Sequence, residues 1–168
     1  LSNFKTGTEI ENISSSSLPS NNSSNNYTYS VWFYVKNWQY RLQDTKYLLK
    51  RNSTNGNNPE ITFSPYENNI NINITMYPKS VGEEEDSFTC TLRNFPLQKW
   101  CNLVVSLNGR TLDMYLDGKL VRTCVLPAVA KSYADSDILL TPNGGFSGWT
   151  SNVQYWGRPL NPQEVYNI

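Results

Sequence analysis

Histidine is absent from the 168-residue chain, and only three cysteines are present. The lack of histidine excludes histidine-based catalytic triads, histidine general bases and metal sites with histidine ligands. Three separated cysteines are too few for a structural zinc site. Charged residues are also scarce, at 17% with a formal net charge of +0 and no basic run, so the sequence lacks the electrostatic signature of a nucleic-acid-binding protein.

Long hydrophobic runs are missing as well. No apolar stretch approaches the roughly 20 residues that span a bilayer, and no charged-then-apolar leader opens the sequence, so we expect no membrane span in this chain.

The length suits one domain with a sizeable core, and we predict a single domain over residues 1–168. Residues 14–26 are almost wholly Ser and Asn, which bury no apolar surface, and we predict a flexible loop there.

Two turn-forming dipeptides organise residues 100–124. Asn108-Gly109 and Asp117-Gly118 each lie between runs of apolar and β-favouring residues, and such dipeptides supply the two positive-φ positions of a type I′ turn. Two hairpins in series predict a three-stranded antiparallel meander. The predicted turn-closing pairs are Leu107 with Arg110 and Leu116 with Lys119.

This register divides the meander into an apolar face and a polar face. The face that is predicted to point into the core carries Leu103, Leu112, Met114 and Val121. The opposite face is largely polar, and on it Asp113 and Arg122 are predicted to lie directly opposite each other. One buried face and one wet face are what an antiparallel sheet of a β-sandwich requires.

The cysteines are interpreted as buried thiols. Cys101 is expected to point into the core and Cys124 to the opposite face two strands away, which makes them poor disulfide partners. Cys90 alternates with Phe88 and Leu92 and is also expected to face inward. A bridge between Cys90 and Cys101 stays open if their strands are neighbours, but buried free thiols are the favoured interpretation.

Alternating apolar residues predict further strands on both sides of the meander. The clearest alternation covers residues 70–76, where Ile and Met alternate with Asn and Thr, so a row of asparagines is expected to face water. Asn161-Pro162 predicts the start of a short helix, with Asn as N-cap and Pro at the first helical position. The other predicted strands are an edge strand within residues 1–13 and residues 27–35, 47–50, 61–63, 88–92, 138–140 and 149–156.

Several of these segments resemble a known family in their order and spacing. The motifs are Tyr29-Ser30-Val31-Trp32-Phe33-Tyr34-Val35, Trp100 with Leu103-Val104-Val105, Met114-Tyr115-Leu116-Asp117-Gly118-Lys119-Leu120-Val121, Gly145-Phe146-Ser147-Gly148-Trp149, Val153-Gln154-Tyr155-Trp156 and Arg158-Pro159-Leu160-Asn161-Pro162-Gln163-Glu164-Val165. Over most of residues 27–168 the chain resembles the laminin G-like and pentraxin branch of the concanavalin A-like lectin/glucanase superfamily. The resemblance implies an all-β fold, a two-sheet antiparallel β-sandwich with jelly-roll topology.

Because the superfamily includes glucanases, the acidic residues bear on enzymatic activity. A retaining glycosidase needs two carboxyls about 5–5.5 Å apart, which on a strand come from residues of one face, two or four apart. Here the clustered acids are Glu83–Asp86, in a predicted charged loop, and no predicted strand carries acids at alternate positions. We therefore predict that the protein is not an enzyme.

Sugar binding needs hydrogen-bonding side chains on a shallow surface and an aromatic platform for the apolar face of a pyranose. Trp38, just past a predicted strand end, is the candidate for an exposed aromatic. On the polar face of the meander, the residues that fit a sugar site, and fit an ordinary solvent-facing surface equally well, are Asn102, Asp113, Tyr115 and Arg122. The tryptophans that are predicted to be core are Trp32, Trp100, Trp149 and Trp156.

Calcium is implied by the resemblance as the usual accessory of the family. Asp135 and Asp137, with Asn143 and with Asn68 and Asn69 from another loop, offer hard oxygen ligands. The alternative, which we favour, is that the two aspartates cap a turn before the strand at residue 138.

The function implied by the resemblance is that of a non-enzymatic binding module, with a glycan as the first-choice ligand and a role in recognition or adhesion. The competing interpretation is a structural packing component of a larger surface assembly, such as a minor capsid or surface protein of a large DNA virus, that contacts protein neighbours and binds no sugar. Both interpretations place the protein outside the cell or on a virion surface.

Overall fold

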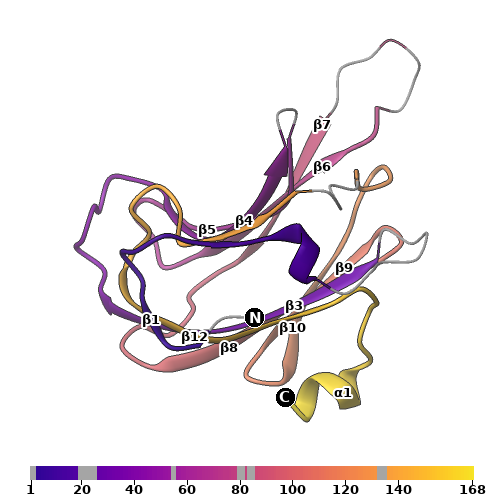
Figure 1. Ribbon diagram of the computed structural model, residues 1–168. Helices are drawn as coiled ribbons and strands as arrows, with labels where there is room; N and C mark the ends of the chain where they lie inside the picture. Colours follow the sequence, from indigo (N-terminus) through magenta and orange to yellow (C-terminus); the bar gives the residue numbers. More distant parts are fainter. Residues whose placement is uncertain (1–2, 19–25, 54–55, 79–81, 83–85, 132–135) are drawn as a thin grey trace.

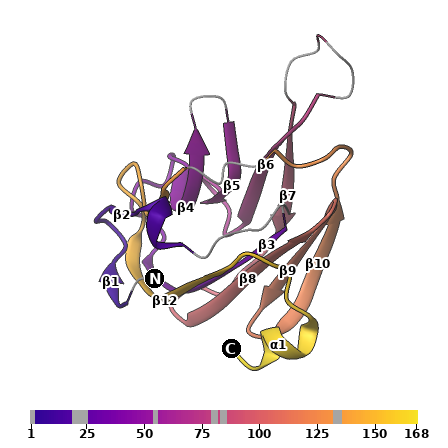
Figure 2. The same ribbon diagram turned by 45° about the vertical axis from the view of Figure 1, so that its right-hand side comes forward.

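Two β-sheets packed face to face make up the computed structural model, which describes residues 3–18, 26–53, 56–78, 82, 86–131 and 136–168. Each sheet has six strands, and the pairings between them are antiparallel. Figures 1 and 2 show the sheets as two layers. The predicted all-β sandwich is confirmed, and its architecture is consistent with a jelly roll.

The first sheet has the strand order β1-β12-β3-β8-β9-β10 and the second sheet has the order β2-β11-β4-β5-β6-β7. The strands of the first sheet are β1 (Lys5–Thr6), β3 (Tyr27–Asn37), β8 (Trp100–Asn108), β9 (Thr111–Leu116), β10 (Lys119–Val125) and β12 (Ser147–Trp156). The strands of the second sheet are β2 (Glu11–Ile13), β4 (Lys46–Ser53), β5 (Gly56–Phe63), β6 (Ile70–Met76), β7 (Asp86–Leu92) and β11 (Ile138–Leu140).

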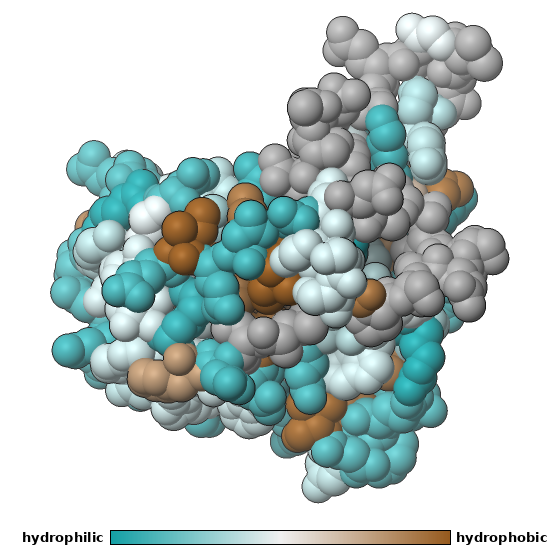
Figure 3. Space-filling model, viewed as in Figure 1, coloured by the Kyte–Doolittle hydropathy of each residue, from teal (hydrophilic) through white to brown (hydrophobic). Residues whose placement is uncertain are grey.

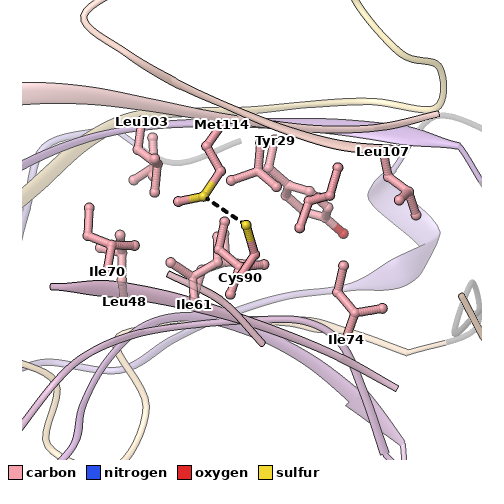
Figure 4. Packing of buried hydrophobic residues seen from close by; sticks show 14 of the residues in the cluster. Tyr29, Leu48, Ile61, Ile70, Ile74, Cys90, Leu103, Leu107 and Met114 are labelled. Carbon is pink, nitrogen blue, oxygen red and sulfur yellow. Dashed lines mark hydrogen bonds between the residues drawn. The ribbon is translucent and has the colours of Figure 1, made fainter. Parts of the chain in front are cut away.

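Alternate residues of the strands fill the space between the sheets. The four apolar residues of β6, at positions 70, 72, 74 and 76, are each 0% exposed, as their period-2 pattern predicted. Figure 4 shows core side chains of the two sheets pointing toward one another, among them Leu103, Leu107 and Met114 from the first sheet and Leu48, Ile61, Ile70 and Ile74 from the second. Each side chain of this size contributes about 1.5–3 kcal/mol when fully buried, so this layer is the main source of stability.

The first hairpin of the meander, β8–β9, closes one residue later than predicted. Asn108 pairs with Thr111, so the turn residues are Gly109 and Arg110. Gly109 alone of the two has a left-handed φ, 62°, which is the pattern of a type II′ turn. The shift moves the pairing by two residues along β9, and because side chains alternate with period two, Leu112 and Met114 still face the core as predicted.

The second hairpin, β9–β10, starts in the predicted register. Lys119 pairs with Leu116 across Asp117-Gly118, whose φ angles of 52° and 83° are both left-handed as a type I′ turn requires. A β-bulge between Leu120 and Arg122 then adds one residue to β10. One extra residue reverses which side chains of the strand face inward.

The bulge overturns two predictions about the meander faces. Val121 was predicted to be buried and is 43% exposed. Asp113 lies opposite Thr123, whose hydroxyl donates a 2.8 Å hydrogen bond to the Asp113 carboxylate, so the predicted pair of Asp113 with Arg122 is not formed. The Nε atom of Arg122 instead lies 3.2 Å from the sulfur of Cys124.

The same bulge turns Cys124 toward the inside, where it forms a disulfide with Cys90 of β7. The bond joins β10 to β7, the last strand of each sheet. The predicted free thiols at Cys90 and Cys124, and the alternative bridge from Cys90 to Cys101, were therefore wrong. Cys101 is a buried free thiol as predicted, and burial, with a smaller effect from Asp117, raises its pKa to about 11. The Cys90 sulfur lies 3.6 Å from that of Met114. Figure 4 shows both side chains in the core.

The N-terminal segment contributes to both sheets, where one edge strand was predicted. β1 lies at the edge of the first sheet and β2 at the edge of the second. Gly7 lies where the chain passes from one sheet to the other. A Cβ added at this position would lie 2.7 Å from the Phe146 carbonyl oxygen, so the position requires glycine. Within the predicted loop of residues 14–26, Ser15–Ser17 form a short 3-10 helix, η1, and residues 19–25 lie outside the described part.

The helix α1 (Pro162–Tyr166) starts at the predicted N-cap. The Asn161 side chain accepts a 2.9 Å hydrogen bond from the Glu164 N–H, and the Glu164 carboxylate accepts one from the Asn161 N–H, which completes a capping box. The helix packs on the outer face of the first sheet in a small second core of Val104, Tyr115, Leu160 and Val165. Across the described ranges, no helix is long and apolar enough to cross a membrane.

Candidate functional site

Two of the residues predicted to bind a sugar are covered by α1. Asn102 and Tyr115 are 3% and 2% exposed, because the helix lies over this part of the first sheet. The Asn102 amide donates a 3.0 Å hydrogen bond to the Ser30 hydroxyl, and its backbone N–H donates one of 2.9 Å to the Asp117 carboxylate. Burial, and next the Asp113 charge, raise the pKa of Tyr115. A ligand would have to displace α1 to reach either side chain.

The structure does not bring the predicted sugar-binding residues together. Asp113 and Arg122 lie on neighbouring strands but have different partners, Thr123 and Cys124. Trp38 is not part of the meander. It packs against the main core, and its Nε1–H donates a 3.2 Å hydrogen bond to the Tyr66 carbonyl. The ligand-binding roles of these residues stay predictions.

The Trp38 ring lies among two aromatic rings and a lysine. Its ring centroid lies 5.9 Å from that of Phe95 and 6.4 Å from that of Phe63. The Lys46 ammonium lies 4.4 Å from the same centroid, and its side chain is buried, which lowers the pKa of this lysine. Trp38 is therefore half-buried rather than the open loop aromatic that its sequence position suggested.

A polar groove on the outer face of the second sheet is the strongest candidate site. It has a volume of about 440 Å³. Each described side chain that lines it carries a hydroxyl, amide or carboxylate group. We call this set the polar groove: Thr45, Tyr47, Glu60, Thr62, Asn71, Asn73 and Thr89.

Strand register explains why these side chains meet. In one cross-strand row Tyr47 pairs with Thr62 and Thr62 with Asn71. In the next row Glu60 pairs with Asn73. Inward-facing Ile61 and Ile72 alternate with these residues, so the core fixes the outward direction of the polar set.

Hydrogen bonds within the groove orient its amides. The Asn73 amide donates a 2.9 Å hydrogen bond to the Thr89 hydroxyl. The Asn71 amide donates one of 2.8 Å to the Ser64 hydroxyl, and its carbonyl oxygen accepts one of 2.8 Å from Thr91. An amide has two donor hydrogens and two acceptor lone pairs, so an oriented pair of this kind retains capacity for a polar ligand.

The electrostatics of the groove centre on a phenol and a carboxylate. Burial raises the pKa of the Tyr47 hydroxyl, and the Glu60 carboxylate raises it further, while a hydrogen bond with Asn143 opposes the shift. The Lys50 ammonium lies 5.6 Å from the centroid of the Tyr47 ring. The groove therefore offers an oxygen-rich surface with one carboxylate, Glu60, and Lys50 lies near its Tyr47 ring without lining it.

Sequence reasoning found only part of this groove. The asparagine row of residues 70–76 was predicted to face water, and Asn71 and Asn73 do lie on the outer face. Glu60 was missed as a lining residue because its strand was predicted only from residue 61 onward, and Thr62 was placed in that strand but not assigned to a site. The alternation of Glu60 and Thr62 with Ile61 and Phe63 was the available signal.

Comparison with known families assigns the fold. A family model described as the concanavalin A-like lectin/glucanases superfamily, Laminin_G_3, matches residues 8–166. The chain belongs to this superfamily. The resemblance stated from the sequence is thereby confirmed.

Solved structures with a similar fold include receptor-binding domains of botulinum neurotoxins. The serotype D binding domain matches with a TM-score of 0.68 at 13% identity, over 98% of this chain and 44% of that one. The serotype G binding domain matches with a TM-score of 0.63 at 15% identity, over 98% of this chain and 45% of that one. The DC binding domain, solved in complex with rat synaptotagmin II, matches with a TM-score of 0.61 at 12% identity, over 84% of this chain and 34% of that one. Identities this low show a shared fold alone.

One curated relative shares part of the sequence. The BEACH domain-containing protein lvsD of Dictyostelium discoideum is 32% identical over an alignment of 80 residues, which covers 41% of this chain and 3% of the relative. The chain therefore spans a small part of this relative and less than half of the neurotoxin binding domains that it resembles.

Glucanases of this superfamily raise the question of catalysis at the polar groove. Glu60 is the one acid among the described residues that line it. Retaining hydrolysis of a glycosidic bond needs two carboxyls about 5–5.5 Å apart, and the lining offers no second one. Of the acid cluster at residues 83–86, Asp86 lies at the start of β7, and residues 83–85 lie outside the described part.

The predicted calcium ligands are placed only in part. The Asp137 carboxylate accepts a 2.9 Å hydrogen bond from the Ser15 N–H, at the start of η1. Asp135 lies outside the described residues. The described part of the chain contains no cluster of three or more His, Cys, Asp or Glu side chains that could hold a metal. Calcium binding by Asp135 and Asp137 stays a prediction.

The four tryptophans predicted to be core lie on the outer face of the first sheet. Trp100 is 38% exposed, and Trp32, Trp149 and Trp156 are half-buried. The core prediction was wrong because the strands that carry them are apolar on both faces, so hydrophobicity alone does not tell inside from outside. Only Trp156 packs against the small core under α1, which leaves the other three near solvent.

Proposed function

We propose that this chain is a non-enzymatic binding module that recognises glycans through the polar groove. The observation that carries the proposal is the groove itself, a hollow of about 440 Å³ in which each described side chain offers a hydrogen-bonding oxygen or nitrogen. A glycan presents hydroxyls that both donate and accept, and a row of amides, hydroxyls and one carboxylate matches that pattern. Membership of a lectin-containing superfamily supports the same ligand class.

Glu60 and Asn73 are the central contacts of the proposed site. A carboxylate accepts hydrogen bonds from two neighbouring hydroxyls at once, and charge-assisted hydrogen bonds are the stronger kind. Asn73 is paired with Glu60 across the strands, so its amide lies beside that carboxylate. The Tyr47 ring on the adjacent strand borders the same hollow and provides an apolar surface for sugar C–H groups.

A glycan array and isothermal titration calorimetry with the strongest array hit test the proposal. Glu60→Gln should weaken binding by about tenfold or more, because a hydrogen bond to a charged group is worth about 1.5–3 kcal/mol. Asn73→Ala should weaken it by about two- to tenfold, because a neutral hydrogen bond contributes about 0.5–1.5 kcal/mol. Asn12→Ala is the matched control, since Asn12 is an exposed asparagine on β2, at the opposite edge of the same sheet. An array without hits, or equal affinities for all four proteins, would contradict the proposal.

The disulfide supports an extracellular location for this module. Disulfides persist in oxidising compartments and are rare in the cytosol of most cells. The Cys90–Cys124 bond links the two sheets of the sandwich. We therefore place the proposed glycan recognition outside the cell.

A packing component of a surface assembly, such as a virion, is the second candidate. The observation in its favour is a group of exposed apolar side chains, including Phe4 at 63%, Val125 at 60% and Val129 at 51%. In the view of Figure 3, however, hydrophobic side chains appear as separate small areas in a hydrophilic surface. Assembly interfaces are usually larger continuous patches, so this view favours the binding module. Analytical ultracentrifugation tests the alternative, which requires self-association or a stable complex with a neighbouring protein.

A further inference from the structure

We propose a second glycan-binding site on the opposite face of the sandwich, which would make a single chain bivalent. The site is a groove of about 410 Å³ on the outer face of the first sheet, here called the aromatic groove, lined by Trp32, Trp100, Ser151, Asn152 and Ile168. The proposal rests on the proposed function for its ligand class and, because the polar groove is the other site, for bivalency. Its residues, sheet and contacts are separate from those of the polar groove.

Two cross-strand rows position the two indoles that line the aromatic groove. In the first row Trp149 pairs with Tyr34 and Tyr34 with Trp100, of which Trp100 reaches the groove. In the second row Ser151 pairs with Trp32, and both line the groove. Two indoles on successive rows of one face thus border a common hollow.

A cluster of four rings holds the Trp100 indole in place. The Tyr34 centroid lies 5.8 Å from that of Trp100 and 5.5 Å from that of Trp149. Phe4 lies 6.3 Å from Trp100 and 6.4 Å from Trp149, which closes the cluster. Aromatic pairs at these separations attract one another, so Trp100 is oriented before any ligand arrives. A pre-oriented indole loses little conformational entropy on binding.

A β-bulge in β12 supplies the polar side of the groove. Ser151 pairs with Trp32 but Gln154 pairs with Ser30, so two residues of β12 lie opposite one of β3. The first of these, Asn152, has a left-handed φ of 49° and is exposed. Bulges redirect side chains and are common next to functional sites, and Asn adopts the left-handed conformation more readily than most residues. The bulge therefore places an amide beside the two indoles.

The chemistry of the groove fits a neutral pyranose. Indole rings stack on the C–H face of a sugar, while the Asn152 amide and the Ser151 hydroxyl can bond its hydroxyls. Trp32 also borders an adjoining hollow of about 130 Å³ that includes Asp117. One Asp117 oxygen accepts a hydrogen bond from a backbone N–H, and the other lies 4.0 Å from the Lys99 ammonium. Because this carboxylate already lies beside a cation, neither charge is left to favour an ionic ligand, and the inferred ligand is an uncharged sugar residue.

Two grooves on opposite outer faces cannot share one small glycan. The aromatic groove lies outside the first sheet and the polar groove outside the second, with the whole core between them. Figure 1 shows the two sheets as separate layers, so their outer faces point in opposite directions. Two sites that point in opposite directions can bridge two glycan-bearing surfaces, which is the event that agglutination measures.

The test compares Trp100→Ala and Asn152→Gly with wild type on the glycan array and in bead agglutination with glycan-coated beads. Glycine suits the left-handed φ of Asn152 and removes only the amide, so this variant keeps the fold if Trp100→Ala does not. Tyr77→Ala is the matched control, an exposed aromatic on the chain after β6. Each groove variant should lose about tenfold or more in affinity for one set of neutral glycans and should abolish agglutination.

The outcomes separate this inference from the proposed function. If both groove variants bind and agglutinate as wild type while Asn73→Ala does not, the aromatic groove is not a glycan site and the polar-groove function stands. If Asn73→Ala is unchanged while Trp100→Ala and Asn152→Gly lose binding, the polar-groove function and bivalency fail, and the aromatic groove stands as the glycan site. Binding to glycan-free phosphatidylcholine–phosphatidylserine vesicles that is lost in Trp100→Ala, with no glycan affected, would overturn the inference in favour of a membrane-facing surface.

Discussion

Removing the Cys90–Cys124 disulfide should lower the stability of this fold by a large and calculable amount. The bond closes a loop with a sequence separation of 34 residues. On the chain-entropy relation, a loop of this length restricts the unfolded state by about 4 kcal/mol at 25 °C. A chain of this size has an unfolding entropy of about 0.35 kcal/mol/K, so the midpoint of thermal unfolding should fall by about 11 °C.

Differential scanning calorimetry of oxidised and reduced wild type measures this shift. The variant Cys90→Ala/Cys124→Ala should fall at least as far, because the cysteine side chains are 0% and 6% exposed and their removal also leaves a small cavity. Cys101→Ser is the control and should respond to reduction as wild type does. Thiol titration of unreduced, denatured protein should count one thiol. A count of three, or equal midpoints for oxidised and reduced protein, would refute the reasoning.

Three further predictions concern single residues. Ile72→Ala should lower the free energy of unfolding in urea by about 2–5 kcal/mol, because Ile72 is 0% exposed between the sheets, and a loss below 1 kcal/mol would contradict that packing. The Cys101 thiol should not react with a thiol reagent in the folded protein at pH 8, since its pKa of about 11 leaves about one molecule in a thousand as thiolate; fast reaction would show it exposed. The hydrogen bond from Arg158 lowers the pKa of Glu164 below 4.5, so its stabilising effect is present above that pH and is lost as pH falls through the lower, folded value. The midpoint difference between pH 6 and pH 3 should therefore be smaller in Glu164→Gln than in wild type, and equal differences would exclude the contribution.

The sandwich could be predicted from the sequence because its strongest signals are local and redundant. The alternation over residues 70–76 defined β6 with its observed bounds. The predicted β8–β9 turn was wrong by one residue, yet the faces of Leu112 and Met114 were right, because the pairing moved by two residues and side chains alternate with period two. A register error of an even number of residues leaves each side chain on the predicted face of the sheet.

The candidate sites were less predictable because tertiary contacts decide which outer faces stay open. Nothing in the sequence around Tyr115 shows that α1, fifty residues later, covers it while Trp100 on the neighbouring strand stays 38% exposed. In the polar groove the outward-facing residues were predicted correctly, but the residues beside them were not. Asn71 and Asn73 were recognised as outward-facing, but their partners on β5 become visible only once the register of β5 and β6 is known.

Single-residue bulges decide which side chains face outward at two positions of the first sheet, and the bulge in β10 overturned the prediction for Cys124. In β10 the extra residue turns Cys124 inward, which converts a predicted free thiol into half of the bond between the sheets. In β12 the extra residue leaves Asn152 exposed beside Trp32 while Val153 stays 0% exposed in the core. A bulge adds one residue to a strand, so the side chains beyond it face the opposite side of the sheet from the one that strict alternation predicts.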